Sequence, residues 1–401
     1  MTIPTKQNSP TYRLFVLIVM VAIAGFAQGM LLPLLAIMLE KAGVSSSLNG
    51  LNAAALYIGI LLASPFIEKP LRRYGYKPII TIGLMAMIVS LLVLPLWQAF
   101  WFWFVLRMII GIADNMVHFA TQVWITTTSP MKKRGRNISF YGFAFGLGFG
   151  LGPFMTRLLQ INEFLPFILS AITSFAAWLL ILRLRNEYPA QDVETGSQSG
   201  TWTRYKAVVK LGWFALLPAF CYGYLESSLH GNFPVYGLRS GLTVEQVSIL
   251  LPAFVVGGLI TQMPLGFLSD RMGRKPLLLM VLFFGGATFM SMVYLEHTFI
   301  GLFLSFALAG AFVGSLYSLG VMYMADLLPP HLLPTGNVMM AVSFGLGSMI
   351  GPMVGGVFID LFERGSLYYS VSGILLLIFF LGICFRSHAP MKNQQKEVAH
   401  S

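Results

Sequence analysis

Charged residues are scarce in this chain. Only 10% of its 401 residues are Asp, Glu, Lys or Arg, whereas about 25% is usual for a soluble domain, and 56% are hydrophobic. This composition excludes an ordinary soluble protein and indicates one integrated membrane domain. The formal net charge of +11 comes from short basic clusters between apolar runs, not from basic helices with interleaved aromatic residues. The charge pattern therefore does not indicate nucleic-acid binding.

Side chains that carry chemistry are also few. The two cysteines, Cys221 and Cys384, lie within apolar runs, so they do not make a zinc site alone and do not indicate a disulfide. The sequence shows no phosphate-binding loop, no cluster of metal ligands and no nucleophile–base set. We therefore expect no enzyme activity, no metal and no cofactor, and we do not expect ATP to be the energy source.

Long apolar segments are what the chain has in abundance. A helix needs about 20 mainly apolar residues to span a bilayer. Twelve segments approach or exceed that length: 13–39, 48–67, 78–97, 99–125, 137–158, 163–182, 211–238, 246–268, 276–295, 298–324, 337–360 and 367–385. The sequence therefore predicts an all-α integral membrane protein with twelve transmembrane helices.

The longest polar interruption divides these helices into two sets of six. Residues 183–210 are predicted to form a flexible cytoplasmic linker between an N-terminal six-helix bundle at 1–182 and a C-terminal one at 211–401, which ends in a short cytoplasmic tail. With the N-terminus placed in the cytoplasm, 21 of the 26 basic residues fall on the cytoplasmic side. We therefore expect a multi-pass protein of the cell (plasma or inner) membrane, in contact with bilayer lipid, with both termini cytoplasmic, and we expect a monomer.

The two halves share sequence features. The segment 145–153 is echoed at 344–352 with an offset of 199, and the segment 73–78 at 271–276 with an offset of 198. Collinear matches at almost one offset indicate a duplicated half. In membrane proteins, duplicated halves are typical of transporters whose substrate site lies between them.

Four local motifs resemble those of the major facilitator superfamily of secondary transporters, and the resemblance covers nearly the whole chain. They are the Gly-x-x-x-Asp-Arg-x-Gly-Arg-Lys loop at 266–275, Arg-x-x-x-Gly at 107–111, and the glycine-rich Gly-Pro segments at 148–153 and 347–356. The resemblance implies a fold in which helices one, four, seven and ten surround a central cavity. It also implies a cytoplasmic latch, made here by Asp270, Arg271, Gly273 and Arg274. The first-half copy of this loop departs from the pattern, with Glu68 and Arg72 in place of Gly266 and Asp270.

The Gly-Pro segments also have a physical interpretation. Glycines three or four residues apart let helices approach closely in lipid, and an internal proline removes a backbone hydrogen bond and permits a bend. We therefore assign a helix-packing or gating role to Gly148, Gly152, Pro153, Gly347, Gly351 and Pro352. Packing alone and a direct part in gating both remain open at this point.

Five ionisable side chains lie deep within predicted spans, where such groups are costly and tend to be functional: Arg107, Asp114 and His118 on helix four, and Glu226 and His230 on helix seven. At 3.6 residues per turn, the three on helix four form one polar stripe. Asp114 with His118, and Glu226 with His230, are one turn apart and able to interact.

These five residues are the candidates for proton coupling. A carboxyl group in a poorly solvated cavity can bind and release a proton near neutral pH, so Asp114 and Glu226 are the candidate carriers, tuned by His118 and His230. Arg107 has either a coupling or a structural role, and both acid–histidine pairs have the alternative role of static links between helices. Pro33 and Pro234 predict local opening of helices one and seven. Neutral polar contacts to a substrate are expected from Gln28, Asn115, Asn232, Gln262 and Tyr317.

The leading functional prediction is a proton-coupled exporter (an antiporter for efflux) of small amphipathic or drug-like molecules that works by alternating access. It rests on the Gly-Pro motif, which is similar to that of exporters in the family, and on the short loops. The alternatives are a proton-coupled importer of a sugar or organic anion, a lipid flippase, and a non-transporting receptor on the same fold. An anion importer would normally use more than one basic residue in its cavity, and only Arg107 is available.

Overall fold

The computed structural model describes residues 9–189, 201–362 and 364–385. Twelve helices within these residues are long and apolar enough to cross a membrane, so the predicted number of spans and the all-α fold class are confirmed. The spans of the first half are α1 (Pro10–Lys41), α2 (Ser46–Ala63), α4 (Tyr76–Val93, extended by the 3-10 helix η2, Leu94–Leu96), α5 (Phe100–Thr128), α6 (Met131–Leu151, continued by the 3-10 helix η3, Gly152–Gln160) and α7 (Leu165–Leu182).

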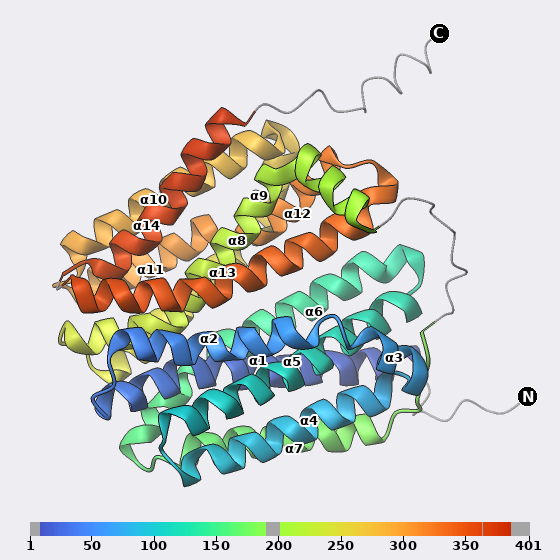
Figure 1. Ribbon diagram of the computed structural model, residues 1–401, viewed down its shortest axis with the longest axis horizontal. Coiled ribbons are helices and arrows are strands. Elements are labelled where there is room, and N and C mark those ends of the chain that lie inside the picture. The colour runs from blue at the N-terminus through green and yellow to red at the C-terminus, as the bar shows by residue number, and fades with distance from the viewer. Residues whose placement is uncertain (1–8, 190–200, 363, 386–401) are drawn as a thin grey trace, which may run out of the picture.

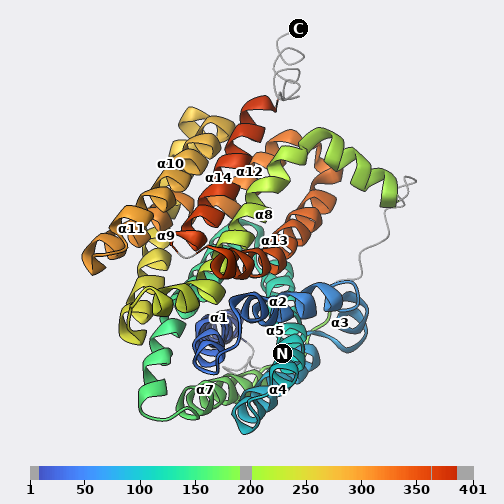
Figure 2. The same ribbon diagram turned by 60° about the vertical axis from the view of Figure 1, so that its left-hand side comes forward.

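The second half follows the same plan. Its spans are α8 (Thr201–Arg239), α9 (Val244–Met272), α10 (Arg274–Leu295), α11 (Phe299–Val313) together with α12 (Leu316–Leu327), α13 (Leu333–Leu361) and α14 (Ser366–Cys384). Two short helices, α3 (Glu68–Tyr74) and η4 (Pro330–Leu332), connect spans. Figures 1 and 2 show α1–α7 gathered on one side of the molecule and α8–α14 on the other.

The segment between the halves differs in part from its prediction. Residues 201–210, expected in a flexible linker, belong to α8, which departs from helical geometry at Gly212 (φ −138°, ψ 27°). The apolar span therefore starts at the kink, near the predicted start at 211, and the residues before it form a polar helical extension. Residues 190–200 of the predicted linker lie outside the described residues.

Two turns at equivalent positions show the duplication in the backbone. Gly75 separates α3 from α4 with φ at 84°, and Gly273 separates α9 from α10 with φ at 91°. Both values lie in the region that favours glycine, because a side chain there would clash with the backbone. The echo of segment 73–78 at 271–276 therefore encodes the same sharp turn twice.

The Gly-Pro segments place helices in close contact at equivalent crossings. Gly148 and Gly152 of the first half pack on α1, and Gly347 and Gly351 of the second half pack on α8. A Cβ atom at Gly148 would lie within 3.0 Å of the carbonyl oxygen of Ala22. Because that atom is main chain, it cannot move aside as a flexible side chain would. The repeated glycines therefore set the spacing of α1 with α6 and of α8 with α13.

The prolines act differently in the two halves. The chain changes from α-helix to 3-10 helix at Gly152, directly before Pro153, whereas α13 remains helical through Pro352. The expected local opening at Pro33 and Pro234 is wrong, because α1 and α8 remain helical through both residues. One proline removes one backbone hydrogen bond, and the neighbouring turns are sufficient to continue the helix.

Candidate functional site

The two halves meet mainly at one end of the molecule. We call this the far end; it carries the connections at 42–45, 161–164 and 240–243 and the residues 362, 364 and 365 that flank α13 and α14. The opposite, linker end carries residues 183–189 and the start of α8. Figure 1 shows α2 and α13 side by side at the far end, on the left, and diverging toward the right. Among the described residues, every hydrogen bond that joins the two halves lies at the far end.

Asp360 of α13 holds the start of α2 at the far end. Its carboxylate accepts hydrogen bonds from the backbone N–H of Ser46 (3.1 Å) and of Ser47 (2.8 Å), and from the Ser47 hydroxyl (2.6 Å). The first N–H groups of a helix have no partner within the helix, and a negative charge is favourable there. Asp360 thus caps a helix of the other half of the molecule.

An arginine extends this far-end contact to α1. Arg239, the last residue of α8, donates two hydrogen bonds to the carboxylate of Glu40, at 2.8 and 3.1 Å, and lies 3.4 Å from Asp360. Such a bidentate pair fixes direction as well as distance. On the other side of the interface, Arg157 of η3 donates to the Ser248 hydroxyl at 2.7 Å. We call Glu40, Asp360, Arg239 and the start of α2 the far-end gate.

The halves separate toward the linker end. Leu259 of α9 packs against Gly146 of α6. One turn further, nothing lies within 4 Å of a Cβ atom placed on Gly142, and Met263 of α9 is 75% exposed. The described structure is therefore closed at the far end and open between α6 and α9 at the linker end.

The contacts of the far-end gate predict how a substitution changes the balance between its open and closed conformations. Asp360→Ala removes a helix cap and an ion-pair partner, and the loss of a cap alone costs about 1 kcal/mol. The ratio of far-end-open to far-end-closed molecules should rise about fivefold or more. The measurement uses spin labels attached at Lys41→Cys and Ser240→Cys, in a chain in which Cys221 and Cys384 have been replaced. A larger share of molecules with a long distance between the two labels would show that the gate opens more often.

Glu163→Gln is the matched control for Asp360→Ala. Glu163 also lies at the far end and is an acidic residue, but it accepts its hydrogen bond from Gln98 of its own half, at 2.9 Å. It should leave the distance distribution unchanged. Equal distributions for both variants would show that Asp360 does not hold the gate.

Arg107 is fully buried between α5 and α2. Its Nη1 donates to the Oδ1 atom of Asn52 at 2.9 Å, whereas Nε and Nη2 have no hydrogen-bond partner among the described residues. A buried arginine restricted in this way joins two helices of one half. Its position favours the structural alternative for Arg107 over direct contact with a substrate.

Asp114 and His118 meet as their spacing predicts. The His118 Nε2 atom lies 3.4 Å from Asp114 Oδ1, and Nδ1 lies 2.8 Å from the hydroxyl of Tyr141 on α6. The histidine ring also contacts Phe145 edge to face, with centroids 5.0 Å apart. Asp114, His118 and Tyr141 therefore form a polar chain that joins α5 to α6.

Glu226 and His230 do not pair through their side chains. His230 Nδ1 lies 2.9 Å from the backbone carbonyl oxygen of Glu226, and its ring contacts Phe149 of the other half in a tilted arrangement, with centroids 4.4 Å apart. The predicted carboxyl–imidazole contact is therefore absent. The imidazole is held instead by the Glu226 carbonyl oxygen, one turn earlier on its own helix, and by its contact with the Phe149 ring.

Among the side chains of the described residues, the Glu226 carboxyl accepts a hydrogen bond only from the Tyr222 hydroxyl, at 3.5 Å. It forms no ion pair with any described residue, and its side chain is only partly buried. Bringing an ionised carboxyl into this position without a cation is costly. Binding a proton removes that cost.

Sequence reasoning missed Tyr57 of α2. This buried tyrosine is near enough to interact electrostatically with Glu226 across the interface, and with Arg107 and Asp114 of its own half. Tyr222 in turn is within range of Tyr57. Because tyrosine is common in apolar helices, nothing in the sequence distinguishes Tyr57; only the packing of α2 between α5 and α8 does so.

Two of the expected substrate contacts hold helices together. Asn115 of α5 donates to the backbone oxygen of Ile60 at 2.8 Å and to the Ser64 hydroxyl at 2.9 Å. Both acceptors lie at the end of α2. Asn232 donates to the backbone oxygen of Pro352 at 2.8 Å. Their amide groups are occupied, which favours a structural role.

The other three expected contacts are differently placed. Gln28 of α1 is almost fully buried, and Gln262 of α9 is exposed. The half-buried Tyr317 of α12 meets Phe344 of α13 edge to face, with centroids 5.6 Å apart, and Tyr222 stacks on the same phenylalanine at 6.2 Å. Aromatic rings therefore line this part of the second half.

The latch residues brace the second half. Arg274 pairs with Asp270 at 2.7 Å and with Asp326 of α12 at 3.3 Å, and Gly273 makes the turn between them. Arg271 is exposed. All the described contacts of this motif stay within one half, so in this conformation it ties α9 and α10 to α12.

The part of the chain that the structure describes has twelve helices able to span a membrane, in two equivalent sets that are closed together at one end and apart at the other, and this arrangement defines the class of secondary transporters. A family model described as Major Facilitator Superfamily matches residues 17–245 and 220–400. The chain belongs to the major facilitator superfamily. The resemblance inferred from its motifs is confirmed.

Relatives support the same assignment. YfkF, an MFS-type transporter of Bacillus subtilis (strain 168), is 46% identical over 362 residues, which is 90% of this chain and 92% of that protein. An MFS-type transporter of Enterobacter sp. (strain 638) is 21% identical over 83% of this chain and 85% of its own length. The relatives are named as transporters, so the expectation of transport and not enzyme activity is also confirmed.

Solved structures share the fold. The nucleoside transporter NupG superimposes with a TM-score of 0.75 over 93% of this chain and 98% of its own, at 14% identity. A bacterial homologue of the human lysosomal transporter Spinster, in an inward-facing and unoccupied conformation, gives 0.73 over 94% and 98%, at 15% identity. At these identities the likeness shows the architecture alone.

Proposed function

We propose that this transporter exports small amphipathic molecules in exchange for protons, by alternating access. The observation that carries the proposal is the Glu226 carboxyl, which lies in a membrane-spanning helix and forms no ion pair with any described residue. A carboxyl in such a place is stable when protonated and costly when ionised. Protonation and release are therefore steps that a conformational cycle can couple to movement of a substrate.

The position of Glu226 supports coupling between the halves. It lies on α8, one turn before His230, whose ring contacts Phe149 of the first half with centroids 4.4 Å apart. A change in the charge of Glu226 thus alters the interactions beside a contact that crosses the interface. A proton shifts an equilibrium between two conformations only through such a difference in interaction. Asp114, already paired with His118, is the second candidate carrier.

Aromatic surfaces near Glu226 support an amphipathic substrate. Phe149 contacts the ring of His230, and Tyr222, Phe344 and Tyr317 form a connected group of rings on the second half. Large aromatic side chains with few polar groups are typical of sites for apolar and aromatic ligands. Arg107 is buried between α5 and α2, where it donates to Asn52, so it is not placed to balance an anionic substrate.

We place the linker end in the cytoplasm, because most basic residues lie on that side. The described conformation then faces inward, with the far-end gate closed toward the outside. An exporter loads its substrate in this state. The protein then needs only to open the gate and close the contact between α6 and α9.

The test is transport of Hoechst 33342, a fluorescent amphipathic weak base, by proteoliposomes that also contain a pH-sensitive dye. With an acidic lumen and with protein oriented so that its cytoplasmic face is outside, we expect dye to enter as protons leave. Reversing the gradient should reverse the flux. Dye and protons moving in the same direction would identify an importer instead, and a flux that ignores the gradient would exclude proton coupling.

A further inference from the structure

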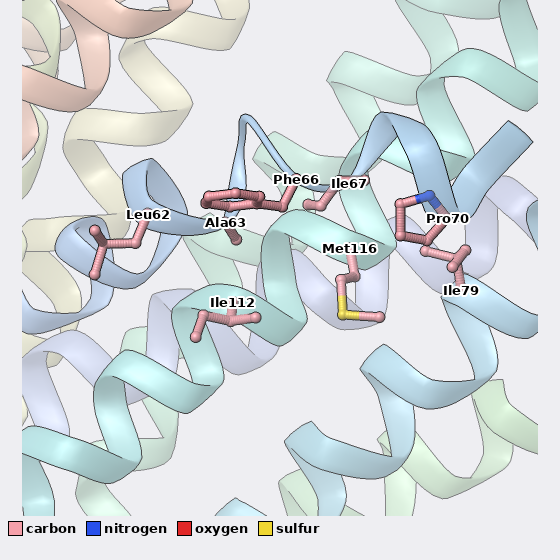
Figure 3. A pocket seen from close by; sticks show the side chains of 8 residues that line it. All are labelled: Leu62, Ala63, Phe66, Ile67, Pro70, Ile79, Ile112 and Met116. Atoms are coloured by element: carbon pink, nitrogen blue, oxygen red, sulfur yellow. The ribbon is translucent and has the colours of Figure 1, made fainter.

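An apolar hollow of about 340 Å³ lies on the first half, where α2 ends and α3 begins (Figure 3). Its wall includes Leu62 at the end of α2, Phe66 of the turn before α3, Pro70 of α3, Ile79 of α4 and Ile112 of α5. All the lining side chains are apolar. The volume is in the range of small-ligand sites in proteins.

The hollow opens away from the interface between the halves. On α5, Ile112 continues a stripe of exposed apolar residues that includes Val105 and Ile109. At 100° per residue, this stripe lies on the face of the helix opposite to Arg107 and Asp114. The hollow therefore faces bilayer lipid and is separate from the proposed transport site.

The edge of the hollow at the linker end is basic. Helix α3, whose Pro70 lines the hollow, carries Lys69 and Arg73, both exposed and neither in an ion pair with a described residue. The acidic residue of the same helix, Glu68, is paired with Arg72 at 3.0 Å. Arg73 also lies over the ring of Tyr74, with its guanidinium carbon 5.2 Å from the ring centroid. Two positive charges without a carboxylate partner among the described residues thus stand on the short helix that lines an apolar surface able to hold a hydrocarbon chain.

We propose that this hollow binds an acyl chain of an anionic phospholipid, with the headgroup phosphate held by Lys69 and Arg73. An apolar wall that faces the bilayer selects a hydrocarbon chain, and basic residues at the membrane surface attract anionic headgroups. This pair of basic residues occurs in the first half alone, because the position in the second half equivalent to Lys69, at an offset of 198, is Phe267. Lipid bound here joins α2 and α5, which carry Tyr57 and Asp114.

The headgroup part is tested by native mass spectrometry of the full chain in detergent with equal amounts of dioleoyl phosphatidylglycerol and dioleoyl phosphatidylcholine. The wild-type protein should retain the anionic lipid preferentially. Lys69→Gln with Arg73→Gln should reduce that preference by about fivefold per residue. The control pair, Lys133→Gln with Arg134→Gln, removes the same charge from exposed residues at the start of α6 and should change nothing. A preference that survives in the first pair, or falls equally in both, would overturn the proposal.

The acyl-chain part has its own pair of variants. Ile112→Trp fills the hollow and should lower the retention of both lipids, whereas Ile109→Trp, on the same stripe but outside the hollow, should not. The two positions are similarly exposed, at 37% and 39%, so any general effect of a tryptophan on folding is common to both. Equal retention by the two variants would show that no chain occupies the hollow. The measurement does not use transport, so its outcome is independent of the proposed function.

Discussion

Glu226→Gln is expected to abolish proton-driven transport and to leave passive substrate exchange intact. The amide has the shape of a protonated carboxyl but does not release a proton, so the conformational cycle no longer depends on the pH gradient. In proteoliposomes, gradient-driven Hoechst 33342 flux should fall to the level of protein-free vesicles. Exchange of labelled for unlabelled dye, with no gradient, should continue.

Two further variants make this result specific. Asp114→Asn tests the second candidate carrier and should weaken coupling less, because the Asp114 carboxyl already has a partner in His118. Glu163→Gln removes an acidic residue from the far end and should behave as wild type. If Glu226→Gln and Asp114→Asn both transported with unchanged coupling to the pH gradient, the assignment of proton carriers would be wrong.

Gly148→Ala is expected to destabilise the protein and to impair transport. Helix propensity alone predicts the opposite, since alanine in a helix is favoured over glycine by about 1 kcal/mol. The added Cβ, however, would overlap the Ala22 carbonyl oxygen of α1, and such overpacking costs about 1–3 kcal/mol. The two helices must then separate, with a lower midpoint in thermal unfolding of the detergent-solubilised protein.

The same helix supplies the control. Nothing lies within 4 Å of a Cβ atom at Gly142, so Gly142→Ala should be neutral or slightly stabilising. Gly347→Ala, the equivalent substitution at the crossing of α8 with α13, should reproduce the effect of Gly148→Ala. If Gly142→Ala and Gly148→Ala unfolded at the same temperature, close packing at Gly148 would not be limiting.

The membrane spans were predictable from sequence because their length and apolarity are imposed by the bilayer, independently of packing. The duplicated glycine turn at Gly75 and Gly273 and the contact of Asp114 with His118 were also accessible, since both depend on residues near in sequence. Glu226 and His230 have the same spacing, yet their side chains do not pair. Spacing along a helix places two Cβ atoms near each other but does not choose between rotamers.

What the sequence could not supply are partners from other helices. The prediction that Asn115 and Asn232 contact a substrate stays a prediction, and the structure adds that their amide groups bind backbone oxygens of neighbouring helices. The importance of Tyr57 depends on Glu226, which comes much later in the chain. From the sequence alone, Asp360 and Arg239 are recognisable only as charged residues at the ends of membrane spans. The contacts of Asp360 with α2 and of Arg239 with Glu40 depend on how the two halves converge in the folded structure.

The cap that Asp360 provides to α2 has a consequence for solvent. When the far end opens, the N–H groups of Ser46 and Ser47 and the Asp360 carboxylate must exchange their bonds with each other for bonds with water. Opening thus takes up water molecules at defined atoms. Impermeant osmolytes on that side of the membrane, which lower the activity of water, should therefore slow the cycle even though they bind nowhere on the protein.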